Sequence, residues 1–172
     1  MFIRPVRPGD AERIAEIYRY YVDETAVTYE ETAPDTAEIA ERIRLITKKY
    51  PYFVAEEEGT VIGYAYASVF KDRESYRYSV ETSIYLDSEK RGRGTGTLLY
   101  DALEKALREI GIKNMYACLA YTEKNDEYLT DQSEIFHKIN GFSVIGKFSK
   151  CALKFGRWYD MIWMEKFISE HE

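Results

Sequence analysis

The chain has 172 residues, 45% of them apolar, and a formal net charge of -6. This length fits one domain over residues 1–172 with a substantial core, whereas the acidic balance argues against a sequence-independent nucleic-acid binder. No segment has the form of a signal peptide or approaches the ~20 apolar residues of a membrane span, so we expect a cytoplasmic protein that binds neither nucleic acid nor membrane.

The first part of the chain predicts strands around two helices. Residues 1–10 indicate a short strand and a turn, and Asp10 is a candidate N-cap for a helix over residues 11–24 with apolar positions at helical spacing. A second helix is expected over residues 37–49. Residues 52–70 then indicate two strands joined by an acidic turn.

Strands and helices alternate in the rest of the chain. The expected elements are a strand over 77–86, a helix over 98–110, a strand over 114–121, a helix over 133–140, and strands over 141–150 and 158–167. The early strands form hairpins, and a single strand, helix, strand crossover joins the middle ones. This pattern predicts an α+β fold with a mixed, mostly antiparallel central sheet flanked by helices.

Cysteine and tyrosine usage gives further bounds. Cys118 and Cys151 show neither zinc-site spacing nor a disulfide framework, so we expect reduced thiols and no metal site. The chain also has 16 tyrosines. Tyrosine suits a partly wet binding cleft as well as a subunit interface, and composition does not distinguish the two.

A glycine-rich loop precedes the third predicted helix. It places Gly92, Gly94 and Gly96 directly after Arg91. Glycines let the backbone approach a ligand closely, and the first N–H groups of the helix that follows have no partner within it. Such a loop suits an anion, most often a phosphate. No Lys follows the last glycine, which excludes a P-loop, and Thr97 stands where a dinucleotide fingerprint has glycine.

The spacing that does fit is Arg or Gln, two residues, Gly, one residue, and Gly or Ala, here Arg91, Gly94 and Gly96. In this motif the chain resembles the GNAT superfamily of N-acetyltransferases. Further blocks resemble its phosphinothricin acetyltransferase branch and lie in family order: IRPVRPGDAERIAEIYRYYV, TAVTYEE, VIGYAYASVFKDRESYRYSVETSIYL, IFHKINGF and KFGRWYDMIWMEK. The chain departs from the branch at Asn140, where Leu is usual, and in a longer segment around residues 122–132.

The resemblance implies a GNAT fold over residues 1–172, a homodimer, and acetyl-CoA as the acetyl donor. It also implies a set of residues that bind acetyl-CoA, on the strand before the loop, in the loop and in two helices. These residues are Ile84, Tyr85, Leu86, Arg91, Gly92, Arg93, Gly94, Thr95, Gly96, Thr97, Ser133 and Phe136.

Glu81 is a candidate general base. Acetyl transfer from a thioester to an amine needs a group that removes a proton from the amine. The period of two places Glu81 with Ser83 and Tyr85 on one face of a predicted strand, where a carboxylate is costly to bury unless it is paired or wet. We therefore expect Glu81 to act through water. An exposed or ion-paired surface carboxylate is the alternative, and the matching family block favours the base.

His137 is the second catalytic candidate. The only other histidine, His171, lies near the end of the chain. An imidazole titrates near neutral pH, and the phosphinothricin branch has a histidine in this helix, which favours His137 as an acid or proton relay. The alternative is a core histidine, because Ile135, Phe136 and Ile139 are its neighbours.

Seven residues lie in blocks that resemble the substrate cleft of the branch: Tyr29, Glu30, Arg73, Tyr76, Tyr78, Trp158 and Asp160. Arg73 is suited to hold a carboxylate or phosphinate, because a guanidinium can make two parallel hydrogen bonds to one. Tyr29, Tyr76 and Trp158 are expected to form walls. Taken singly, each of the seven also fits an ordinary packing or surface role.

Together these features predict direct transfer of an acetyl group from acetyl-CoA to the amine of a small molecule. The resemblance implies the α-amine of an amino acid or of a toxic analogue such as phosphinothricin, methionine sulfone or methionine sulfoximine. Two alternatives remain: acetylation of a protein N-terminus or lysine, and CoA binding without catalysis.

Overall fold

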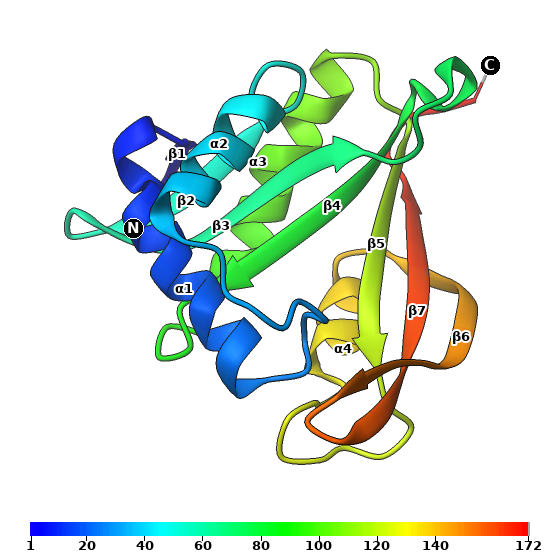
Figure 1. Cartoon of the computed structure of the whole chain (residues 1–172). Coiled ribbons are helices and arrows are strands. Elements are labelled where there is room, and N and C mark those ends of the chain that lie inside the picture. Colours follow the sequence, from blue (N-terminus) through cyan, green and yellow to red (C-terminus); the bar gives the residue numbers. More distant parts are fainter. Residues whose placement is uncertain (172) are drawn as a thin grey trace.

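In the computed structural model, which describes residues 1–171, seven strands form one sheet in the order β1-β2-β3-β4-β5-β7-β6. Figure 1 shows this sheet with helices on both faces. The strands are β1 (Phe2–Pro5), β2 (Tyr52–Glu57), β3 (Thr60–Val69), β4 (Ser79–Leu86), β5 (Asn114–Tyr121), β6 (Ser143–Lys154) and β7 (Arg157–Phe167). Strands β4 and β5 are parallel and the other neighbours antiparallel, which confirms the predicted mixed sheet.

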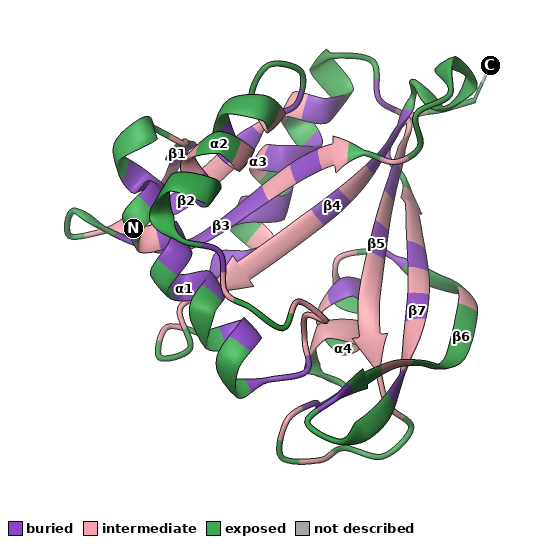
Figure 2. Cartoon of the chain, viewed as in Figure 1, coloured by how far each residue is buried: buried purple, intermediate pink, exposed green. Residues whose placement is uncertain are grey.

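Two apolar clusters hold the helices to opposite faces of the sheet (Figures 1 and 2). Helices α1 (Ala11–Glu24) and α2 (Thr36–Ile46) pack on β2 and β3 through one cluster. Helix α3 (Thr95–Glu109) packs on the other face, and α4 (Gln132–Ile139) reaches that cluster through Phe136. Among the described residues, none of the helices combines the length and the apolar composition needed to cross a membrane.

Two helix starts show how local contacts decide the boundaries. The Asp35 carboxylate accepts a hydrogen bond from the Glu38 N–H at 2.8 Å and caps α2. The helix therefore begins at Thr36, one residue before its predicted start. Asp10 precedes α1 as predicted, but its carboxylate does not cap that helix. It pairs with the Arg4 guanidinium at 2.8 Å and accepts the N–H of Arg7, because the buried Arg4 needs a counterion.

The strand that carries Glu81 begins later than predicted. A short 3-10 turn, η2 (Glu74–Tyr76), ends the connection from β3, and the strand starts at Ser79. Its alternation is as expected, since Val80 and Thr82 are buried under α3 while Glu81 lies on the opposite face. At the other end of the sheet, β6 continues past its predicted end, through a bulge near Lys150.

The parallel pair β4–β5 separates after three residues. Ser79, Val80 and Glu81 align with Asn114, Met115 and Tyr116, and the pairing then stops although both strands continue. Figure 1 shows the strands diverging, with α4 behind the gap. Backbone groups along this gap have no ladder partner on that side, so a ligand can use them.

Candidate active site

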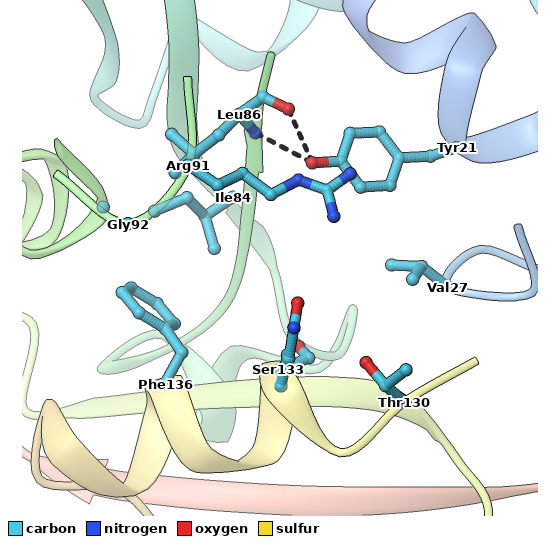
Figure 3. Close-up of a pocket in the computed structure, with 11 residues that line it drawn as sticks. Tyr21, Val27, Ile84, Leu86, Arg91, Gly92, Thr130, Ser133 and Phe136 are labelled. Atoms are coloured by element: carbon cyan, nitrogen blue, oxygen red, sulfur yellow. Dashed lines mark hydrogen bonds between the residues drawn. The ribbon is translucent and has the colours of Figure 1, made fainter. Parts of the chain in front are cut away.

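A pocket of about 240 Å³ opens where β4 diverges from β5 (Figure 3). Its walls come from the end of β4, the glycine loop, α1 and α4. The lining residues are Tyr21, Val27, Ile84, Leu86, Arg91, Gly92, Gly96, Thr130, Gln132, Ser133 and Phe136. The pocket therefore gathers Ile84, Leu86, Arg91, Gly92, Gly96, Ser133 and Phe136 from the residues expected to bind acetyl-CoA.

The glycine loop has the geometry that an anion site requires. Gly92 and Gly94 both have φ of 77°, a left-handed conformation that favours glycine, and Gly94 is the N-cap of α3. The first N–H groups of α3 have no carbonyl one turn earlier, and Gly96 at this end lines the pocket. The loop and the helix terminus fit the diphosphate of a CoA molecule.

Gly96 also allows close packing between α3 and α4. A Cβ atom at this position would lie 2.7 Å from Cε2 of Phe136, which is closer than real side chains come. Phe136 lines the pocket in turn (Figure 3). Gly96 thus lets the Phe136 ring form part of the pocket wall.

Arg91 supplies a positive charge at the pocket mouth. Its guanidinium lies 5.2 Å from the ring centre of Tyr21 and 5.4 Å from that of Tyr20. Tyr21 donates a hydrogen bond to the Leu86 carbonyl at 2.6 Å, which ties α1 to the end of β4 (Figure 3). Burial raises the pKa of Tyr21, so this hydroxyl keeps its proton at neutral pH.

The other residues expected to bind acetyl-CoA do not line this pocket. The Tyr85 ring faces α1 and meets Tyr18 at 4.9 Å, since alternation turns it away from Ile84 and Leu86. Arg93 pairs with Glu57 at 3.4 Å, and Thr95 is buried. Gly94 and Thr97 also lie outside the lining. For these residues, a contact with acetyl-CoA remains a prediction.

The sequence reasoning missed four lining residues. Tyr21 carries only the signal of a core-facing helix position, and Val27 follows in the adjoining loop. Thr130 and Gln132 come from the segment in which the chain departs from the family, where no motif marks them.

A smaller cavity continues into the gap between β4 and β5. It shares Val27, Ile84 and Ser133 with the first pocket and adds residues of both strands and of α4. The added residues are Thr82, Ser83, Tyr85, Cys118, Leu119, Ala120 and His137. The two cavities together form a path from the glycine loop into the sheet.

Glu81 stands where that gap begins. It is the last β4 residue in register with β5, opposite Tyr116, and its side chain is half-buried. Burial raises the pKa of the Glu81 carboxyl, and the charge of Lys71 opposes that rise. A carboxylate with a raised pKa, near an unpaired strand edge, is suited to take a proton from an ammonium group.

His137 is fully buried on the α3 face of the sheet, the face opposite that of Glu81. Its Nδ1 lies 2.7 Å from the Ser133 carbonyl and its Nε2 lies 2.8 Å from the Tyr100 hydroxyl. The carbonyl can only accept, so Nδ1 carries the proton and Nε2 accepts from Tyr100. Burial lowers the pKa of His137 to about 4, which makes the ring neutral at pH 7.

The surroundings of His137 differ from the apolar stripe that the sequence indicated. Ile135 and Ile139 are exposed, whereas His137 points into the core beside Phe136. Hydrogen bonds at both ring nitrogens compensate for its burial.

The residues expected in the substrate cleft divide into two groups. Tyr29 donates to the Asp160 carbonyl at 2.5 Å, and Trp158 and Asp160 line one shallow surface pocket near Tyr121. Glu30, in the same loop as Tyr29, forms an ion pair with Arg42 at 2.9 Å. Within one chain these residues lie apart from Arg73, Tyr76 and Tyr78, and their role in substrate binding stays a prediction.

The second group lies at the other end of β5. Arg73, Tyr76 and Tyr78 are exposed in the β3–β4 connection, where the Tyr78 carbonyl accepts from Asn114. Asp160 is paired with Tyr121, and Tyr121 follows Asn114 by seven residues on β5. Seven residues of extended strand span roughly 23 Å, which separates the two groups. Glu81 pairs with Tyr116, so it lies nearer to Arg73, Tyr76 and Tyr78 than to Trp158 and Asp160.

The chain is similar in sequence to known proteins over most of its length. A family model described as an acetyltransferase (GNAT) domain matches residues 3–163. The chain is 32% identical to an L-methionine sulfoximine/L-methionine sulfone acetyltransferase of Salmonella typhimurium, over 99% of this chain and 96% of that protein.

Two solved structures have the same fold over most of the chain. A GNAT superfamily phosphinothricin acetyltransferase from Sinorhizobium meliloti in complex with AcCoA is 39% identical, with a TM-score of 0.88 over 96% of this chain and 87% of that one. A ribosomal-protein-alanine N-acetyltransferase from Brucella melitensis is 30% identical, with a TM-score of 0.88 over 97% and 99%.

Proposed function

This chain belongs to the GNAT acetyltransferase family, and on that premise we propose that it is an acetyl-CoA-dependent N-acetyltransferase acting on the α-amine of an amino acid or amino-acid analogue. Phosphinothricin, methionine sulfone and methionine sulfoximine are the first compounds to test, because relatives are named for them. The observation that carries the proposal is the pair of adjoining cavities that lead from the glycine loop into the β4–β5 gap, which begins at Glu81.

Acetyl-CoA supplies an acetyl group activated as a thioester. In this proposal the N–H groups at the start of α3 and the Arg91 guanidinium hold its diphosphate. Ile84, Leu86 and Phe136 surround its less polar arm, and the unpaired edges of β4 and β5 orient it. The remaining residues expected from the resemblance, among them Ser133, add contacts in the same pocket.

Glu81 serves as the general base. Its carboxylate takes a proton from the acceptor ammonium, through a water molecule, and so frees the nitrogen lone pair for direct attack on the thioester. The raised pKa of Glu81 brings this carboxyl closer to neutral pH than an ordinary one, which makes it a stronger base once ionised.

His137 contributes through Tyr100 in this scheme. A neutral imidazole whose two nitrogens are both hydrogen-bonded has no spare proton to give. We therefore propose that His137 fixes the Tyr100 hydroxyl beside Thr82 on β4. The departing thiolate then takes the second proton, which the attacking nitrogen loses as the amide forms and the C–S bond breaks.

We also propose a cytoplasmic homodimer. Strand β6 forms one edge of the sheet and exposes apolar side chains, among them Phe148, Leu153 and Ile145, and Trp158 on the neighbouring strand is 62% exposed. A two-fold contact is the commonest way to cover such a surface. Light scattering at micromolar concentration is expected to give twice the monomer mass of 20.2 kDa.

One relative favours a second candidate function. The Brucella melitensis structure is named as an enzyme acting on a ribosomal protein alanine, so an alanine N-terminus is a further possible acceptor class. Non-catalytic CoA binding is a third reading, which the Glu81 geometry disfavours.

A competition assay separates these readings. Purified enzyme and acetyl-CoA are mixed with methionine sulfone, methionine sulfoximine, phosphinothricin, a polyamine and an alanine-terminated peptide, and kcat/KM is measured for each by thiol release. The proposal expects the highest kcat/KM for an amino-acid analogue. A higher value for the peptide or the polyamine would replace it, and release with none of the acceptors would support CoA binding alone.

A further inference from the structure

The segment between β5 and α4, in which the chain departs from the phosphinothricin acetyltransferase branch, contains a closed loop over residues 125–131. Its two ends are joined by a pair of hydrogen bonds. The Asp131 N–H donates to Oδ1 of Asn125 at 3.0 Å, and the Asn125 side-chain amide donates to the Asp131 carboxylate at 3.1 Å. Inside the loop, the Asp126 N–H donates to the Leu129 carbonyl at 2.9 Å. The 125–131 loop is therefore held in one shape by its own contacts.

The Asp126 carboxylate fixes this loop to β7. Its Oδ1 accepts hydrogen bonds from the backbone N–H groups of Tyr128 and Leu129, both at 2.8 Å, which forms a turn. Its Oδ2 accepts from the Tyr159 hydroxyl at 2.9 Å and pairs with the Arg157 guanidinium at 3.1 Å. Burial acts to raise the pKa of Asp126, but these contacts outweigh it and hold the pKa below its ordinary value.

The 125–131 loop also contacts the connection between α1 and α2. The Tyr128 carbonyl accepts a hydrogen bond from the Ala26 N–H at 2.9 Å, and the buried Leu129 side chain packs with Ala26 and Tyr159. The Tyr128 ring stacks on Phe155 in the β6–β7 turn, with centroids 4.4 Å apart. The loop thus joins the α1–α2 connection to the β6–β7 hairpin.

These contacts lead to one side of the acetyl-CoA pocket. Val27 comes directly after Ala26, Thr130 comes directly after Leu129, and both line the pocket (Figure 3). Gln132, the first residue of α4 and the next residue after the loop, lines it as well. This side of the pocket therefore depends on the position of the 125–131 loop.

We infer that Asp126 is a positioning residue for acetyl-CoA binding, because it fixes the loop that places Val27 and Thr130 in the pocket wall. The inference rests on the proposed function, since it takes this pocket to be the acetyl-CoA site. Asp126 does not itself line the pocket and acts through the backbone that it holds. A loop that is ordered before the ligand arrives loses less conformational entropy on binding. Asp126 thus contributes to affinity and leaves the chemistry at Glu81 unchanged.

Asp126→Ala tests this role, because it removes the acceptor of the two backbone N–H groups and so loosens the loop. We expect the Kd of acetyl-CoA, measured by calorimetric titration, to rise about 10-fold, the size of losing one hydrogen bond to a charged group. KM for acetyl-CoA should rise by the same factor. At saturating acetyl-CoA, kcat and KM for methionine sulfone should keep their wild-type values. A role in folding alone would instead reduce the active fraction, which lowers kcat and leaves KM unchanged.

Two further variants separate the turn from the ion pair. Asp126→Asn keeps a side-chain oxygen that can accept from Tyr128 and Leu129, so its Kd should stay within about 2-fold of wild type. Glu127→Ala is the matched control. The exposed Glu127 carboxylate pairs with the same Arg157 guanidinium at 2.5 Å, and its removal should leave Kd unchanged.

Circular dichroism shows whether each variant is folded. If Asp126→Ala is not, Asn125→Ala decides, because it opens the ends of the loop and should raise Kd in the same direction. Unchanged Kd in the folded loop variants, or an equal rise in Glu127→Ala, would overturn the inference.

The wild-type protein separates this inference from the proposed function. If it binds acetyl-CoA and acetylates no amino-acid analogue, the proposed function fails, while the Kd values still decide the role of Asp126. If the wild-type protein does not bind acetyl-CoA, both fail.

Discussion

The Nε2 atom of His137 accepts a hydrogen bond from the Tyr100 hydroxyl at 2.8 Å, and both side chains are buried. The contact joins α4 to α3 behind the β4–β5 gap. Because the second ring nitrogen donates to the Ser133 carbonyl, the imidazole holds one tautomer.

Stability should depend on the charge state of His137. Burial lowers the pKa of His137 from 6.5 to about 4, so below pH 6.5 the unfolded chain binds a proton that the folded protein refuses. The free energy of unfolding should therefore fall between pH 6.5 and pH 4, by up to about 3 kcal/mol. Urea denaturation at a series of pH values measures this loss.

The matched variant for that experiment is His137→Phe, which removes the titrating group. It should be less stable at pH 7, because the Tyr100 hydroxyl loses its acceptor, but its stability should fall less steeply below pH 6.5. Equal slopes in the two proteins would show that the imidazole is not held neutral.

Glu81→Gln should lower kcat by about 100-fold, because the amide keeps the shape of the side chain and cannot accept the proton. The rise of kcat/KM with pH that reports ionisation of Glu81 should disappear. Glu165→Gln is a suitable control. Glu165 on β7 pairs with Tyr116 on β5, so this substitution removes a carboxylate from the same face of the sheet. Wild-type rates in Glu81→Gln would exclude it as the base.

Gly96→Ala should weaken acetyl-CoA binding by about 10-fold, since the new methyl group would lie 2.7 Å from Phe136 and force that ring to move. Calorimetric titration with acetyl-CoA measures the effect. A second change, Phe136→Leu, should restore part of the affinity by vacating the space. Gly146→Ala is the control, because a Cβ there meets nothing within 4 Å.

Cys118→Ala should keep most of the activity. Cys118 lines the gap, but burial raises the pKa of its thiol to about 12, with Glu81 adding to the rise, so no thiolate forms at neutral pH. Initial-rate plots with two varied substrates should intersect, as direct transfer requires. Parallel lines, or an acetylated wild-type protein by mass spectrometry without acceptor, would indicate a covalent route instead.

Much of the fold could be predicted because its signals are local. Alternation placed Val80 and Glu81 on opposite faces of β4, and Gly111 ends α3 with φ of 83° as expected of a C-terminal glycine. The divergence of β4 from β5 was not predictable in this way. Each strand reads as continuous in sequence, and only the register between them stops at Glu81 and Tyr116.

The candidate site follows the same division. The glycine loop was predictable because its function depends on the backbone conformation of consecutive residues. The environment of His137 depends on Tyr100, 37 residues earlier, and the ring of Phe70 stacks on Tyr116 and meets Trp163, which belong to two other segments. Neither arrangement has a signature in any one segment, so both needed the three-dimensional structure.

The short pairing between β4 and β5 has a consequence for the protein in solution. Strands β1 to β4 form one half-sheet and β5 to β7 another, and backbone hydrogen bonds join them over only a few residues. Amide protons along the facing edges should exchange with deuterium fastest when the enzyme is alone. Acetyl-CoA that binds across the gap would contact both half-sheets. Because it binds the folded protein, it should slow amide exchange in both half-sheets and raise the melting temperature.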